Sequence, residues 1–263
     1  MFDGYDALTK DSTRQKRSGK MLQVVEISDT NPCPSDRDLF LANYTNKQTF
    51  VSALAAKLEL SGVNAILCSS DADTTIVKTA LKIDDISALV LTDDTDNICL
   101  MMHHVHVSDK SYDIFIKNMT RKKASDQRVC YRIQDVLDES DTVIAEFILF
   151  AHAFTGCDTT SAIHNFGKQS IFTKLRSSAS LREIARQFYV YNVSPQEIGQ
   201  SAIRFFETLH SPTCSLKQIR KQKYNRMVLS DRAKIDPDLL PPSQEQPTTM
   251  VSEFTTRSKC GSN

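Results

Sequence analysis

The sequence predicts an α/β fold with a mainly parallel sheet. Two short apolar runs, residues 63–68 and 88–91, have the composition of buried strands, and a helix is predicted between them at residues 74–81. This strand–helix–strand order is typical of a parallel pair. Because the second run consists of small and apolar residues without polar alternation, we expect it to be buried on both faces.

Carboxylates follow both predicted strands. They are Asp71 and Asp73 after the first strand, and Asp93, Asp94 and Asp96 after the second. Ligands of open α/β sheets bind beyond the carboxyl ends of the strands, where these side chains would crowd together. A divalent cation relieves the repulsion within such a cluster. The alternative is structural: Ser69 or Ser70 caps the next helix, acids in its first turn suit the helix dipole, and the second cluster is a solvated turn.

The composition narrows the class of protein. A chain of 263 residues suits one large domain or one domain with a tail, and 32 basic against 32 acidic residues neither require nor exclude nucleic acid. Seven scattered cysteines without a CxxC pair are neither a disulfide framework nor a zinc motif. The sequence has no apolar stretch of membrane-span length and no apolar signal segment at its start, so we expect a nuclear or cytoplasmic protein without a membrane partner.

Further elements follow from apolar periodicity and turn residues. The sequence predicts helices at residues 48–60, 141–155, 181–189 and 195–209, a short strand or buried turn at 21–27, and a strand running into a helix at 131–136. From residue 236 the chain is rich in Pro, Ser, Gln and Thr, which predicts a disordered tail.

Three histidines, His103, His104 and His106, lie within four positions. If this segment is a strand, alternation puts His104 and His106 on one face and His103 on the other, so the three do not converge. We therefore expect exposed or partner-facing histidines rather than a metal site.

Three segments have a composition suited to phosphate contacts. Residues 10–20 and 217–226 are basic, and each is either a solvated helix face or a helix lying on phosphates. The third segment spans residues 156–168, where Asn165 and Gly167 could supply positive φ. Two short helices around such a turn could hold a phosphate on their backbone amides.

Together these segments resemble the flap-endonuclease group of PIN-like nucleases. FDG at residues 2–4 is similar to the family's FDG strand end, SDAD at 70–73 to its S-E-A-E pair, TDDTD at 92–96 to its T-E-D-x-D cluster, TGCD at 155–158 to its L-G-x-D, and residues 163–168 to its G-I-G-x-K loop. The resemblance covers about residues 2–175. The family's first strand, with its aspartate, lies upstream of FDG and has no counterpart in this sequence.

The resemblance implies a PIN-like core with a helix-two-turn-helix region and C-terminal helices. It divides the chain into a nuclease core at residues 1–155, the helix-two-turn-helix and helical region at 156–235, and the tail at 236–263. The implied metal ligands are Asp3, Asp71, Asp73, Asp94, Asp96 and Asp158. Lys10 and Arg17 would contact the scissile phosphate, and Asn165, Gly167 and Lys168 would contact duplex phosphates, with K⁺ at the loop.

The implied function is structure-specific cleavage of DNA with two Mg²⁺ or Mn²⁺ ions, as in DNA repair in the nucleus. Flap, branched or single-stranded DNA is the expected partner, and hard carboxylate ligands suit these ions rather than zinc. Two alternatives stay open. One is a non-catalytic nucleic-acid-binding module that retains the fold, and the other is a protein-interaction module whose acidic clusters are caps and turns.

Overall fold

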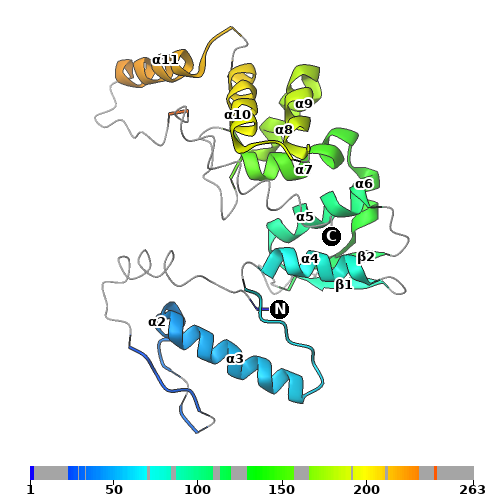
Figure 1. Ribbon diagram of the computed structural model, residues 1–263, viewed down its shortest axis with the longest axis vertical. Helices are drawn as coiled ribbons and strands as arrows, with labels where there is room; N and C mark the ends of the chain where they lie inside the picture. Colours follow the sequence, from blue (N-terminus) through cyan, green and yellow to red (C-terminus); the bar gives the residue numbers. More distant parts are fainter. Residues whose placement is uncertain are drawn as a thin grey trace. The chain divides into compact units, whose positions relative to one another are not determined.

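A computed structural model describes residues 1–2, 23–28, 30–32, 34–69, 72–83, 87–108, 113–119, 129–156, 166–190, 192–210, 213–230 and 240–241. The chain forms two compact units, residues 1–76 and 77–263 (Figure 1). No helix within these described ranges has the length and apolar character needed to cross a membrane. The predicted tail at 236–263 lies outside the described residues except for 240–241.

The first unit is built on two helices, α2 (Arg37–Ala42) and α3 (Tyr44–Leu60). Helix α3 extends the predicted helix at 48–60 by one turn because Asn43 caps it, accepting the backbone N–H of Asn46 at 3.2 Å. The short strand or buried turn predicted at 21–27 is wrong for the described residues 23–28, which have no regular structure and none of which is buried. Instead, the buried Asn46 side chain accepts the N–H of Val25 at 2.8 Å and donates to the carbonyl of Gln23 at 2.9 Å. Phe2 forms an isolated parallel bridge with Leu67, within the predicted strand at 63–68.

The α/β class is confirmed by a three-stranded sheet in the second unit. Its strands are β1 (Ala88–Leu91), β2 (Ile114–Lys117) and β3 (Cys130–Arg132), in that order across the sheet. Strands β1 and β2 are parallel, whereas β2 and β3 are antiparallel, so this sheet is mixed rather than mainly parallel. The predicted burial of β1 on both faces is wrong, because Leu89 and Leu91 are 54% and 53% exposed. Strand β1 lies at an edge of this sheet, and Ala88 is its only buried residue.

Helix α5 (Thr95–Val107) connects the parallel strands β1 and β2. His103, His104 and His106 therefore lie on a helix and not on a strand. A parallel pair cannot be joined by a tight turn and needs a crossover, which is usually a helix. The helical period places His103 and His104 in the core, where they are 6% and 3% exposed, so the expectation of exposed histidines fails for both.

Helix α7 (Thr142–Phe154) lies at the centre of the core, as its apolar run predicts. Asp141 caps it by accepting the N–H of Ile144 at 2.9 Å. The same carboxylate binds Arg176 of helix α8 (Lys168–Ser177) through its other oxygen at 2.5 Å. The helix ends at Phe154 with Thr155 as its C-cap, and the φ of +97° at the following Gly156 favours a residue without a Cβ.

Helices complete the second unit. They are α4 (Ala72–Lys82), which begins in the first unit, α6 (Ile133–Glu139), α8, α9 (Ala179–Arg186), the 3₁₀ turn η1 (Gln187–Tyr189), α10 (Pro195–His210) and α11 (Leu216–Leu229). The helices predicted at 74–81, 181–189 and 195–209 are confirmed, with 181–189 divided between α9 and η1. Helix α10 begins at Pro195 behind a reciprocal cap, because the Ser194 N–H donates to Glu197 Oε2 at 2.9 Å and the Glu197 N–H donates to Ser194 Oγ at 3.3 Å.

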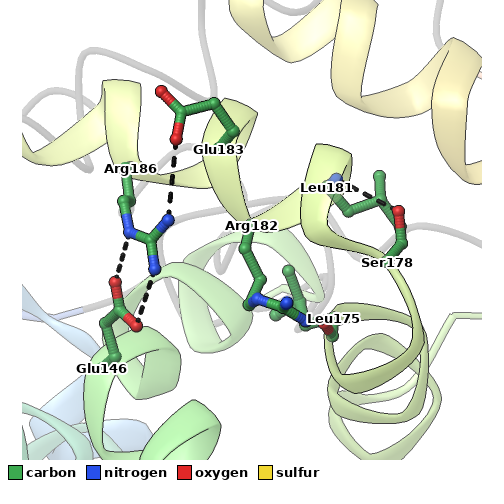
Figure 2. Close-up of polar contacts among 7 residues, drawn as sticks. All are labelled: Glu146, Leu175, Ser178, Leu181, Arg182, Glu183 and Arg186. Atoms are coloured by element: carbon green, nitrogen blue, oxygen red, sulfur yellow. Dashed lines mark hydrogen bonds and ion pairs between the residues drawn. The ribbon is translucent and has the colours of Figure 1, made fainter.

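Arginines of α9 attach this helix to its neighbours (Figure 2). Arg186 donates to Glu146 of α7 at 2.7 Å and lies 3.6 Å from Glu183. Arg182 donates to the carbonyl of Leu175 at 2.6 Å and so satisfies a carbonyl at the end of α8. Ser178 caps α9 by accepting the N–H of Leu181 at 3.2 Å. These contacts hold α7, α8 and α9 as one packed group.

Candidate functional site

The candidate site is the turn between β1 and α5, where the predicted TDDTD cluster lies. Thr92 organises this turn, since its Oγ1 accepts the N–H of Asp94 at 3.0 Å and the side-chain amide of Asn97 at 3.3 Å. The N–H of Thr92 donates to the carbonyl of Lys117 at 3.2 Å. Asp93 accepts the N–H of Met119 at 2.9 Å. The carboxyl end of β1 is therefore hydrogen-bonded to the chain leaving β2.

Asp94 caps helix α5. Its Oδ1 accepts the N–H of Asp96 at 2.9 Å, and its side chain is exposed. Within the described residues, Oδ2 of Asp94 has no hydrogen-bond partner, so this oxygen remains available to a cation or to water. Asp94 therefore has the structural role of a helix cap. The cap uses only Oδ1 of the carboxylate.

Asp96 forms a buried pair with His152. Its Oδ1 lies 2.7 Å from His152 Nε2, and the two side chains are 6% and 2% exposed. A carboxylate only accepts hydrogen bonds, so Nε2 carries the proton and donates. Nδ1 of His152 is buried and has no hydrogen-bond partner in the described part of the chain. The pair connects the first turn of α5 with the last turn of α7 and fixes the orientation of the Asp96 carboxylate.

A second group of buried polar rings lies further along α5. The His103 ring stacks on Tyr189 of η1 at 5.4 Å between centroids and meets His104 edge-on at 5.1 Å. Burial, followed by the charges of His104 and His106, lowers the pKa of His103 to about 4. The Tyr189 hydroxyl accepts the backbone N–H of Phe150 at 3.0 Å, and burial raises the pKa of Tyr189. His103 is therefore neutral at physiological pH and acts as a packing residue.

Two of the predicted metal ligands, Asp94 and Asp96, lie together at the start of α5 in the second unit. Asp73 lies in the first turn of α4, in the first unit. No group of three His, Cys, Asp or Glu side chains in the described part of the chain is arranged to hold a metal ion. The remaining predicted ligands and phosphate contacts lie outside the described residues: Asp3, Lys10, Arg17, Asp71, Asp158 and Asn165.

The predicted positive φ at Gly167 is wrong. Its φ is −87° and it is the N-cap residue of α8, with Lys168 as the first helical residue. A Cβ at this position would meet no atom within 4 Å, so neither the backbone angle nor the available space requires glycine there. Gly167 and Lys168 still lie at a helix N-terminus, where backbone N–H groups favour anions.

His152 was missed by the sequence reasoning. His152 is the single polar residue in the apolar run FILFAHAF. A buried histidine in such a helix needs a hydrogen-bonding partner, and this requirement could have drawn attention to it. The identity of that partner could not be read from the run, since Asp96 lies 56 positions away.

Searches against family models, curated proteins and solved structures found no match to this chain. The site must therefore be interpreted from its own chemistry.

Proposed function

We propose that the protein is a metal-dependent, structure-specific nuclease that hydrolyses phosphodiester bonds of DNA, on a PIN-like version of the α/β fold. The supporting observation is the position of Asp94 and Asp96 at the carboxyl end of β1, beside the parallel strand β2. Ligands of open α/β sheets bind at such ends. The resemblance to flap endonucleases names the same two residues as metal ligands.

The proposed donor set consists of carboxylates, which suits Mg²⁺ or Mn²⁺. It comprises Asp3, Asp71, Asp73, Asp94, Asp96 and Asp158. Bound ions would activate a water molecule and stabilise the attacking and leaving oxygens. The fit is best supported at Asp94, whose Oδ2 has no partner within the described residues.

The chain's own residues would orient these donors and bind the substrate. His152 holds one oxygen of Asp96, and the α5 cap holds one oxygen of Asp94, so both carboxylates are restrained before any ligand binds. Lys10 and Arg17 would stabilise charge on the scissile phosphate. Asn165, Gly167 and Lys168 would hold duplex phosphates, with K⁺ bound at their loop.

The test is cleavage of flap, branched and single-stranded DNA in Mg²⁺ or Mn²⁺, comparing wild type with Asp94→Asn. Asparagine retains the helix cap and removes the charge, so a folding defect does not confound the result. Asp93→Asn is the matched control, because Asp93 is the neighbouring carboxylate outside the proposed donor set. We expect Asp94→Asn to lower turnover more than the roughly 10–100-fold typical of losing a group that only orients a ligand. Equal turnover by wild type and Asp94→Asn would refute the assignment.

A second candidate function is a non-catalytic module that binds nucleic acid or protein. Specific observations favour it: Asp94 already caps α5 and Asp96 is already paired with His152, so each carboxylate has a role without a metal. A nucleic-acid-binding module predicts salt-sensitive DNA binding without turnover. A protein-interaction module predicts binding of neither DNA nor Mn²⁺, which calorimetry with each ligand separates from the other cases.

A further inference from the structure

The three-stranded sheet is packed on one face and open on the other. On the packed face, Ala88, Ile114 and Ile116 are 6%, 3% and 1% exposed and belong to the hydrophobic core that includes α5 and α7. Successive side chains of a strand point to opposite faces of a sheet, so Leu89 and Leu91 point away from this core. Both leucines are about half exposed.

The pairing register shows which side chains share the open face, because residues that pair across strands point to the same side. Leu89 pairs with Phe115, and Phe115 pairs with Arg132 on its other side. Leu91 pairs with Lys117. Asp113 joins this set, because its Oδ1 lies 2.8 Å from Nη2 of Arg132. We refer to this surface as the outer sheet face, which is formed by Leu89, Leu91, Asp113, Phe115, Lys117 and Arg132.

Two charged groups of the outer sheet face lack partners among the described residues. Arg132 uses Oδ1 of Asp113 for both of its contacts with that carboxylate, and it also binds Asp135 at 2.7 Å. Oδ2 of Asp113 therefore has no partner in the described part of the chain. The ammonium group of Lys117 likewise pairs with no described carboxylate. These two groups flank Phe115, two positions before it and two positions after it.

This order of side chains makes the outer sheet face complementary to a copy of itself. Asp113, Phe115 and Lys117 occupy alternate positions, so an acid, an aromatic ring and a base follow one another along β2. A twofold axis at Phe115, perpendicular to β2 and within the interface, would place the β2 strand of a second copy antiparallel on this one. Each Asp113 then faces the Lys117 of the other copy, and the Phe115 rings meet at the axis.

A second copy satisfies the outer sheet face more fully than other partners do. It supplies a cation for Asp113 and an anion for Lys117, whereas a nucleic acid would bring phosphates close to Asp113. It also covers Leu89, which lies level with the axis. Arg132 would meet its own copy, and Asp113 and Asp135 balance its charge.

We propose that the outer sheet face binds a second copy of the chain about this twofold axis, so that two sheets pack face to face. Strands of up to four residues in a three-stranded sheet give a face of roughly 13 by 14 Å. This is much smaller than the roughly 800 Å² that each partner buries in a stable complex. The dimer is therefore weak, with a dissociation constant on the order of 100 µM. The proposal goes beyond the proposed nuclease function and does not depend on it.

The first test is sedimentation equilibrium of the full chain from about 10 µM to about 1 mM. Wild type should show a monomer–dimer equilibrium. Leu89→Lys places a cation at the axis and should weaken dimerisation about tenfold or more. The matched control is Leu60→Lys, because Leu60 is 89% exposed on α3, outside the outer sheet face. This control should dimerise as wild type does.

A second test uses charge reversal to examine the twofold arrangement. Lys117→Glu and Asp113→Lys should each dimerise about tenfold more weakly than wild type, because like charges then face each other. In a mixture of these two variants both ion pairs form again with reversed or original sign, so the heterodimer should recover the wild-type affinity. Lys78→Glu, at an exposed lysine of α4, is the control and should not restore the dimer when it is mixed with Asp113→Lys. Circular dichroism establishes that each variant is folded.

Three results would overturn the proposal: wild type that stays monomeric up to about 1 mM, equal dimerisation by wild type and Leu89→Lys, or no recovery in the mixture of Lys117→Glu with Asp113→Lys. A monomer that binds single-stranded DNA, with binding lost in Leu89→Lys, would assign the outer sheet face to nucleic acid instead. None of these measurements uses cleavage, so a failure of the proposed nuclease function would leave the dimer result intact.

Discussion

Replacing His152 by leucine would remove the buried hydrogen bond between His152 Nε2 and Asp96 Oδ1. The two side chains are only 2% and 6% exposed, so water cannot replace the lost hydrogen bond. Removing one member of such a pair typically costs about 3–5 kcal/mol of unfolding free energy. Asp96→Asn keeps an acceptor for His152 Nε2–H and removes only the charge, so we expect a loss of about 1 kcal/mol.

The assay is urea unfolding followed by far-ultraviolet circular dichroism, with both single variants and the Asp96→Asn/His152→Leu double variant. In the Asp96→Asn background residue 96 is neutral, so replacing His152 should lower the unfolding free energy by less than it does in wild type. The double-mutant cycle should therefore give a coupling energy of about 2 kcal/mol. Glu146→Gln is the control, because it breaks the Arg186 ion pair, whose side chains are 48% and 38% exposed, and such surface pairs contribute about 0–1 kcal/mol. A loss below about 1 kcal/mol for His152→Leu, or a coupling near zero, would refute the reasoning.

Three other predictions concern the core and one cap. The pKa of His103 is about 4 in the fold against 6.5 when unfolded, so its stabilising effect is complete above pH 6.5 and is lost as the pH falls towards 4. As the pH falls over this range, the unfolding free energy of wild type should therefore decrease by about 3 kcal/mol more than that of His103→Leu. Urea titrations at several pH values measure both unfolding free energies. Equal pH dependence of the two unfolding free energies would contradict the prediction. Gly167→Ser should stabilise the protein by a few tenths of a kcal/mol, roughly, because it adds the missing side-chain cap of α8 without a steric clash, and a lowered thermal midpoint would argue against it. Tyr189→Phe should cost about 1 kcal/mol, because it removes the hydrogen bond from the Phe150 N–H to the Tyr189 hydroxyl, and an unchanged midpoint of urea unfolding would show that this hydrogen bond adds nothing.

Elements with strong local signals could be predicted from the sequence. Helix α7 has an apolar run, a capping Asp141 and a terminal Gly156, and helix α10 has Pro195 behind Ser194, so both were predicted to within a residue or two. Helix α5 was not, because its run of apolar residues and histidines has no decisive period and its helical state follows from the crossover between β1 and β2. The exposure of Leu89 was likewise set by the place of β1 in the sheet.

The candidate site was predictable in its carboxylates and not in their partners. TDDTD after a strand is a local pattern, and Asp94 and Asp96 are found together at that strand end. The pairing of Asp96 with His152 depends on the packing of α5 against α7, which no local pattern encodes.

Asp141 serves two elements with one side chain, and this shapes which sequences the position tolerates. Its Oδ1 starts α7, and its Oδ2 holds Arg176 of α8. Asparagine, serine or threonine at position 141 could keep the cap yet would lose the ion pair, whereas glutamate could keep the charge yet would cap poorly. Arg176 only forms the ion pair and caps no helix. In a library of variants at both positions, position 176 should therefore accept most polar residues, whereas position 141 should accept few. Variation at these two sites should therefore be asymmetric, with substitutions accumulating on α8 before they reach the start of α7.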